Sequence, residues 1–154
     1  LHRPTIFAPG TETVTVPDVR GVRTAIIVCS YIQSRAVRSR LRAERPQVIL
    51  ASLANPSDRG WFVAGMTARM FDAWVVTANR YGRDARTFFD GQMSVSDPLG
   101  TLRLKAKGGE QYLFADIAVV EDPSPLVRVL RRAWAGVSMA AHVLGSVRLL
   151  FGAG

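Results

Sequence analysis

The chain contains a single cysteine, Cys29, and its thiol is the group best placed to carry chemistry. It ends the most strand-like run of the sequence, which begins at Val22, and the polar residues Ser30 and Tyr31 follow at once. A thiol at the carboxyl end of a buried strand is held rigidly and faces the crevice in which α/β sheets bind ligands. A free cysteine is also among the most buried residue types and often packs as a small hydrophobe. Position alone therefore leaves open both a nucleophile and a core residue.

Composition argues against other kinds of site. The two histidines, His2 and His142, are far apart and have no metal-ligand spacing, so we expect no metal centre and no cofactor. One cysteine excludes an intramolecular disulfide, which is typical of a reducing, cytoplasmic compartment. The chain begins without a signal-peptide pattern and without Met, and we expect it to be a fragment of a longer protein.

The formal net charge of +8 raises the question of a nucleic-acid partner. Part of the excess lies in one segment, where Arg35, Arg38, Arg40, Arg42 and Arg45 are opposed only by Glu44. Aromatic residues do not alternate with these arginines, as they do where single-stranded nucleic acid binds. We therefore interpret them as a solvated helix face and expect no nucleic-acid partner.

The elements that position Cys29 follow from the apolar pattern. Apolar runs predict strands over 22–29, 47–53 and 74–78, and helical periodicity predicts helices over 34–45 and 61–73. The order strand, helix, strand, helix, strand is typical of a parallel sheet with right-handed crossovers, which makes the fold class α/β. The near-continuous apolar character of 47–53 predicts a central strand covered on both faces.

The remainder of the chain has a different character. Residues 88–95 and 101–106 predict a β-hairpin around the turn 97–100, and 111–119 predicts a further strand. We expect residues 1–123 to form one domain and residues 124–154 to form an apolar and basic helix. Docking on the domain or on a second subunit is the favoured role of this helix, which predicts a homo-oligomer. Binding to an anionic membrane surface is the less favoured alternative.

Several short motifs, taken in order, resemble the C-terminal half of the nitrilase or carbon-nitrogen hydrolase superfamily. One is the run from Ala25 to Cys29, which is similar to the strand that ends in the family's catalytic cysteine. The others are Ile6 to Gly10, Pro46 to Leu50, Ala68-Arg69 with Asp72, Ala78 to Gly82, Phe89 to Gly91, Asp97 to Gly100 and Ala115 to Ile117. The resemblance covers residues 6–117 and implies half of an α-β-β-α sandwich.

The resemblance also implies a reaction. Cys29 would attack the carbon of a small-molecule amide or nitrile to give a thioester-like intermediate that water hydrolyses. The family's general-base glutamate and its lysine lie upstream of the cysteine, so we expect no turnover from these 154 residues alone. Tyr31, Asn55 and Trp61 are candidates for substrate contacts, because they lie close to Cys29 or follow the second strand. A turn-forming Asn55 and two packed aromatic rings are the alternatives.

The sequence departs from the family after the cysteine. Ser30 and Tyr31 stand where an aromatic and an acidic residue are usual, and Ser34, Arg35 and Ala36 replace a phenylalanine-proline-glutamate run. Two other functions therefore stay open beside hydrolysis. One is a non-catalytic interaction protein with the same fold, and the other is an acyl transferase in which an amine captures the thioester.

Overall fold

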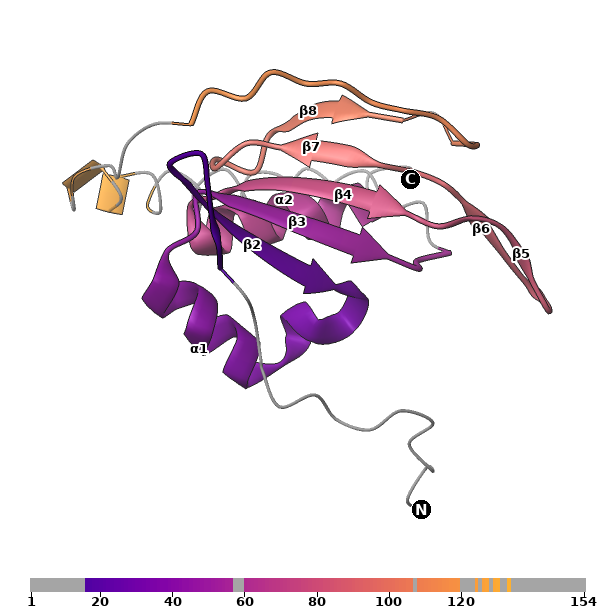
Figure 1. The fold of residues 1–154 in the computed structure, drawn as a ribbon, viewed down its shortest axis with the longest axis horizontal. Coiled ribbons are helices and arrows are strands. Elements are labelled where there is room, and N and C mark those ends of the chain that lie inside the picture. Colours follow the sequence, from indigo (N-terminus) through magenta and orange to yellow (C-terminus); the bar gives the residue numbers. More distant parts are fainter. Residues whose placement is uncertain are drawn as a thin grey trace, which may run out of the picture.

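The computed structural model describes residues 16–56, 60–106 and 108–119, together with 124, 126–127, 129–130 and 133. Its main element is a six-stranded mixed sheet in the order β1-β2-β3-β4-β7-β8 (Figure 1). The strands are β1 (Asp18–Val19), β2 (Val22–Val28), β3 (Val48–Leu53), β4 (Trp74–Asn79), β7 (Ser94–Ser96) and β8 (Leu102–Lys105).

The three apolar runs form the parallel centre of this sheet. β2 pairs with β3 and β3 with β4, with Ile26, Leu50 and Val76 in register across the three strands. The connections are a 3-10 helix, η1 (Cys29–Gln33), followed by α1 (Arg35–Glu44), and then α2 (Gly60–Phe71). The predicted α/β class and the alternation of strands and helices are therefore confirmed.

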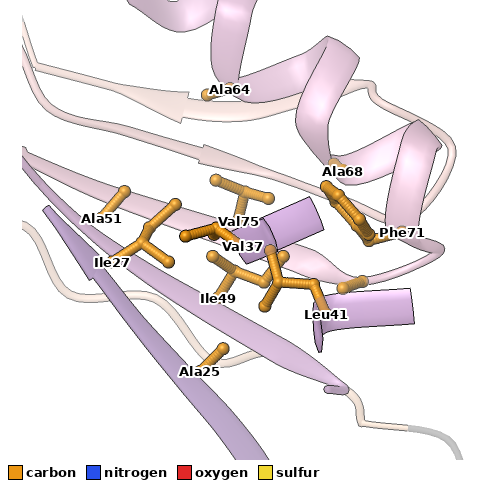
Figure 2. Close-up of a cluster of buried hydrophobic side chains, with 11 residues drawn as sticks. Ala25, Ile27, Val37, Leu41, Ile49, Ala51, Ala64, Ala68, Phe71 and Val75 are labelled. Atoms are coloured by element: carbon orange, nitrogen blue, oxygen red, sulfur yellow. The ribbon is translucent and has the colours of Figure 1, made fainter. Parts of the chain in front are cut away.

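Both helices pack on one face of the sheet, where they bury a single apolar core (Figure 2). Val37 and Leu41 of α1 are completely buried against Ile49 of β3. From α2, Ala64, Ala68 and Phe71 enter the same cluster. The exposed residues Phe62, Met66 and Met70 follow one another at intervals of about one turn along α2. The periodic apolar residues of this helix therefore include its outer, solvent-exposed face.

α1 ends where the sequence predicted a stop. Arg45 has a left-handed conformation with φ of 49°, its N–H donates to the carbonyl of Leu41 at 3.0 Å, and Pro46 follows. A left-handed residue after the last helical turn satisfies a carbonyl that the helix leaves open. The chain then returns to the sheet as β3.

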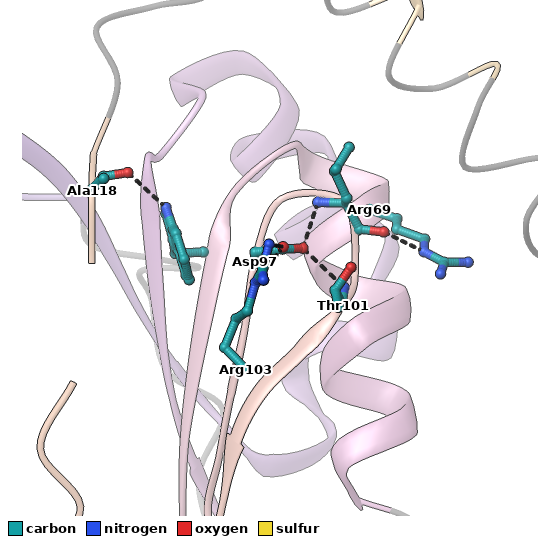
Figure 3. A network of polar contacts seen from close by, with 7 residues as sticks. Arg69, Asp97, Thr101, Arg103 and Ala118 are labelled. Atoms are coloured by element: carbon teal, nitrogen blue, oxygen red, sulfur yellow. Dashed lines mark hydrogen bonds and ion pairs between the residues drawn. The ribbon is translucent and has the colours of Figure 1, made fainter. Parts of the chain in front are cut away.

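The turn between β7 and β8 is fixed by a buried carboxylate (Figure 3). Asp97 is 3% exposed, and its Oδ1 accepts the N–H groups of Leu99 and Thr101 at 3.0 and 2.9 Å. Its Oδ2 accepts a hydrogen bond from Nε of Arg103 at 2.7 Å and forms an ion pair with Nη2 of the same side chain at 2.6 Å. Arg69 of α2 donates Nε to the carbonyl of Leu99 at 2.6 Å, which attaches this turn to the helix layer.

The predicted hairpin differs in its first strand. Residues 88–95 are not one strand, because Gly91, with φ of 74°, separates β6 (Thr87–Asp90) from β7. β6 pairs instead with β5 (Tyr81–Asp84), which the sequence did not predict, in a separate two-stranded sheet. In Figure 1 this hairpin extends beyond the carboxyl end of β4.

One further expectation was wrong, and another is met on one side only. Residues 111–119 form no strand, and Tyr112 and Phe114 are 88% and 90% exposed, so this apolar run does not pair as a ladder. β3 is covered on one face only within the described chain, since Leu50 is 39% exposed. Its neighbours Ile26 and Val28 are 53% and 57% exposed on the same face of β2, opposite the helices.

Some predictions fall outside the described residues. These are the motif from Ile6 to Gly10 and most of the proposed helix 124–154, of which residues 126–127, 129–130 and 133 are helical. The division at residue 123 therefore stays a prediction. No helix in the described part of the chain has both the length and the apolar character needed to cross a membrane.

Candidate active site

Cys29 directly follows β2 as the first residue of η1, and its backbone is in an uncommon conformation. Val28 is still extended, with φ of −117°, and Cys29 then takes φ of 46°. A residue with a Cβ atom in the left-handed region costs roughly 1–2 kcal/mol relative to the right-handed one. The chain reverses immediately afterwards, because Ser34 donates its N–H to the carbonyl of Tyr31 at 2.9 Å before α1 begins.

Four other non-glycine residues of the described chain have positive φ, namely Arg20, Arg45, Asp72 and Ala85. Two lie in turns between adjacent strands and two follow the ends of α1 and α2. Among the five described non-glycine residues with positive φ, only Cys29 lies at the carboxyl end of an inner parallel strand. Such strain persists where the surroundings enforce it, and it is concentrated at sites of ligand contact or chemistry.

A pocket of about 260 Å³ opens beside the partly buried Cys29. It lies on the helix side of the sheet, between the ends of β2, β3 and β4, the 3-10 helix η1 and the first turns of α2. Its lining residues are Ile27, Cys29, Ser30, Ile32, Gln33, Ala51, Leu53, Ala54, Asn55, Gly60, Val63, Ala64, Thr67, Val75 and Thr77. The predicted nucleophile thus borders a space that a small molecule can enter.

Asn79, the last residue of β4, fixes the loop that carries Asn55. Its Oδ1 accepts the N–H of Asn55 at 2.9 Å, and its Nδ2 donates to the carbonyl of Asn55 at 2.8 Å. Arg80 also donates its N–H to the carbonyl of Leu53 at 3.0 Å. Hydrogen bonds therefore continue to join the two chain segments beyond the ends of β3 and β4. Asn79 therefore positions the backbone of one wall of the pocket.

The inner wall contains two threonines whose hydroxyl groups are already bonded. Thr67 donates Oγ1 to the carbonyl of Val63 at 2.8 Å. Thr77 accepts the N–H of Ser94 at 2.8 Å, and its hydroxyl shares a hydrogen bond of 2.9 Å with the Ser94 hydroxyl. These bonds leave mainly carbon surface for a ligand at this end of the pocket.

The predicted site residues do not all meet here. Asn55 lines the pocket with Cys29, whereas Tyr31 and Trp61 are not among the described residues of its lining. Tyr31 is half exposed, and the Trp61 ring contacts Phe62 edge-on and lies 5.8 Å from Nζ of Lys105. Sequence reasoning missed Gln33, Thr67 and Thr77, which meet only because of the strand register and the helix packing.

The pocket is electrically neutral along the walls that the structure describes. None of its lining residues is an Asp, Glu, His, Lys or Arg. The described residues also hold no group of three or more His, Cys, Asp or Glu side chains that would bind a metal ion. Within the described chain, Cys29 therefore has neither a general base nor a cation in its pocket.

No protein-family model and no curated protein matches the sequence. Solved structures do match, and they share the fold of the nitrilase or CN-hydrolase superfamily over part of their length. XC1258 from Xanthomonas campestris, a CN-hydrolase superfamily protein with an arsenic adduct in its active site, has a TM-score of 0.63 and 23% identity over 82% of this chain.

Two other structures extend the comparison. The glutamine-dependent NAD+ synthetase of Acinetobacter baumannii has a TM-score of 0.63 and 22% identity over 76% of this chain. A mutant of the Nesterenkonia AN1 amidase, from the nitrilase superfamily, has a TM-score of 0.55 and 22% identity over 68%. In another mutant of this amidase the acetamide moiety of fluoroacetamide is covalently added at the active site cysteine.

The match spans only part of these proteins. It covers 49% of XC1258, 24% of the NAD+ synthetase and 40% of the amidase. The predicted resemblance and the predicted partial nitrilase-like fold are therefore confirmed at the level of structure.

Proposed function

We propose that the full-length protein hydrolyses a carbon-nitrogen bond of a small-molecule amide or nitrile, with Cys29 as the nucleophile. The observation that carries this proposal is the position of Cys29, at a strained strand-to-helix bend beside a pocket. The fold is shared with an amidase whose active site cysteine forms covalent adducts. A rigidly held thiol at such a bend is suited to attack a bound carbon atom.

The reaction with an amide has two stages. The Cys29 thiolate bonds to the carbonyl carbon, the carbon-nitrogen bond breaks, and the amine leaves after taking up a proton. Water then attacks the resulting thioester, the carbon-sulfur bond breaks, and a carboxylic acid and the thiol are released. A nitrile first adds the thiolate to its carbon and a proton to its nitrogen, and water then displaces ammonia to give the same thioester.

These proton transfers need groups that the described walls of the pocket do not supply. The resemblance places a glutamate and a lysine upstream of Cys29, and we propose that they complete the site in the longer protein. The exposed sheet face around Ile26, Val28 and Leu50 would then pack against the second sheet of the sandwich. On this proposal the 154 residues alone have no turnover.

The test is ammonia release by the full-length protein from a panel of amides and nitriles. We expect release that is lost in Cys29→Ser and retained in the control Ser39→Ala, an exposed position on α1. Turnover that survives Cys29→Ser would contradict the assignment of the nucleophile.

A non-catalytic interaction protein is the second candidate, because no ionisable side chain apart from the thiol itself lines the described pocket. It predicts that no amide or nitrile leaves an adduct on Cys29 of the full-length protein. Acyl transfer gives the same adduct as hydrolysis. Acyl transfer is distinguished from hydrolysis by adding an amine that competes with water for the thioester, because transfer then yields a new amide.

A further inference from the structure

We propose that the outer surface of the helix layer binds an anionic lipid bilayer, lying on it without crossing it. Two rows of side chains carry this inference, and they belong to helices that pack on the same face of the sheet. The arginine row is Arg35, Arg38 and Arg42 of α1, and the apolar row is Phe62, Met66 and Met70 of α2. Both rows lie on the opposite side of the sheet from Ile26 and Val28, so a second sheet packed there would leave them accessible.

The arginine row opposes the ordinary preferences of a helix. Its members recur at intervals of three and four residues, so they follow one side of α1 and repel one another. The first turn, from Arg35 to Arg38, carries two cations at the end where the helix dipole favours anions. In the sequence of α1 the only acidic residue is Glu44, and it pairs with Arg40, outside the row, at 2.9 Å. Such a departure from local preference is expected where a surface binds a partner.

The apolar row is exposed at helical spacing. Phe62, Met66 and Met70 are 45%, 39% and 42% exposed, and Val63 beside them is 51% exposed. Ala68, on the other side of α2, is completely buried in the core, so the row points outward. Aromatic and flexible thioether side chains adapt to an irregular apolar partner such as lipid chains. α2 has 12 residues, whereas roughly 20 are needed to cross a bilayer, so the helix would lie in the interface.

Cations border the apolar row on both sides. Toward α1, the guanidinium of Arg42 lies 5.8 Å from the centre of the Phe71 ring, at the end of α2. Toward β8, Nζ of Lys105 lies 5.8 Å from the centre of the Trp61 ring, near the start of α2. An apolar strip between cations and aromatic rings matches the boundary between the acyl chains and the headgroups of an anionic bilayer.

A second copy of the chain is the alternative occupant of this surface. A two-fold dimer brings the same surface of both copies together. With cations on both sides of the apolar row, such a dimer would place cations opposite cations whichever way the two-fold axis runs along the surface. Charge complementarity therefore favours an anionic bilayer over a second copy.

Sedimentation of the full-length protein with lipid vesicles tests the proposal. We expect binding to vesicles of equal parts phosphatidylcholine and phosphatidylglycerol, and at least about tenfold weaker binding to phosphatidylcholine alone. Binding should also weaken as sodium chloride shortens the Debye length. Arg35→Gln combined with Arg42→Gln should weaken it by about 25-fold, at about fivefold for each charge removed.

Matched variants place the effect on this surface. Arg83→Gln combined with Arg86→Gln removes two exposed arginines from the β5–β6 hairpin, changes the net charge equally and should weaken binding by less than about threefold. Phe62→Gln should weaken binding by about tenfold and Phe88→Gln by less than about threefold. These two rings are 45% and 52% exposed, and each contacts one neighbouring ring edge-on. Met66→Gln repeats the test of the apolar row without removing a ring, and urea unfolding confirms that each variant is folded.

Equal binding by the row variants and their controls would overturn the proposal, as would equal binding to the two kinds of vesicle. A dimer that Phe62→Gln dissociates, in a protein that does not sediment with vesicles, would overturn it in favour of a second copy. The experiment is independent of Cys29. Vesicle binding by a protein that releases no ammonia would retain the surface and refute the enzyme, whereas ammonia release without vesicle binding would do the reverse.

Discussion

Replacement of Asn79 tests whether one side chain holds the loop that lines the pocket of Cys29. Its amide makes two hydrogen bonds of 2.9 and 2.8 Å to the backbone of Asn55. Asn79→Ala removes both bonds. Asn79→Asp keeps an acceptor for the N–H of Asn55 but turns an oxygen toward its carbonyl, where the Nδ2 donor had been.

Each neutral hydrogen bond contributes about 1 kcal/mol net, so Asn79→Ala should lower the free energy of unfolding by about 1–3 kcal/mol. Asn79→Asp should cost at least as much, because its carboxylate faces a carbonyl oxygen. Asp84→Asn is the matched control on β5, the next strand along the chain. It breaks an exposed ion pair with Arg80, whose side chains are 45% and 57% exposed, and should cost less than about 1 kcal/mol.

Urea unfolding followed by tryptophan fluorescence measures these free energies, and hydrogen exchange of the Asn55 amide reports on the loop itself. We expect Asn79→Ala to accelerate that exchange and to broaden the reaction of Cys29 toward bulkier alkylating probes. If Asn79→Ala changed stability by less than about 0.5 kcal/mol and left the Asn55 exchange rate unaltered, the role of Asn79 as the support of this wall would be refuted.

Four further substitutions, at three positions, test the scaffold by the same unfolding assay. Gly100→Ala should cost more than about 2 kcal/mol, because φ is 78° and a Cβ atom would lie 2.6 Å from the carbonyl of Gly65. A cost below about 0.5 kcal/mol would contradict this packing. Asp97→Ala should cost about 2–4 kcal/mol and Asp97→Asn clearly less, since Asn still accepts the N–H groups of the turn and Arg103 is exposed enough to regain water. Equal losses would show that the ion pair dominates. Leu41→Ala, at a fully buried position, should cost about 2–5 kcal/mol, and a neutral result would exclude it from the core.

The sequence predicted the parallel centre of the fold because local and tertiary preferences agree there. The runs that became β2, β3 and β4 are strongly apolar, and Pro46 stops α1 next to a left-handed Arg45. The β5–β6 hairpin was missed because β5, from Tyr81 to Asp84, is polar and exposed. Its turn also has Ala85 at φ of 48° in place of the usual glycine or asparagine.

The candidate site was predicted only in part. Cys29 and Asn55 could be selected because each follows an apolar run, and carboxyl ends of parallel strands meet at one edge of a sheet. Thr67 and Thr77 carry no local signal. They face the pocket because α2 turns its small residues toward the sheet and because β4 lies beside β3 in a particular register. Such pairings are set by packing between segments far apart in the sequence.

Covalent trapping on the full-length protein is the decisive test of Cys29 as a nucleophile. The protein is incubated with short aliphatic amides and nitriles, quenched in acid and analysed by intact-mass and peptide mass spectrometry. We predict an adduct with the mass of the acyl group on the peptide that contains Cys29, and its loss in Cys29→Ser. Ammonia release with no adduct on Cys29, unaffected by Cys29→Ser, would show that another group is the nucleophile.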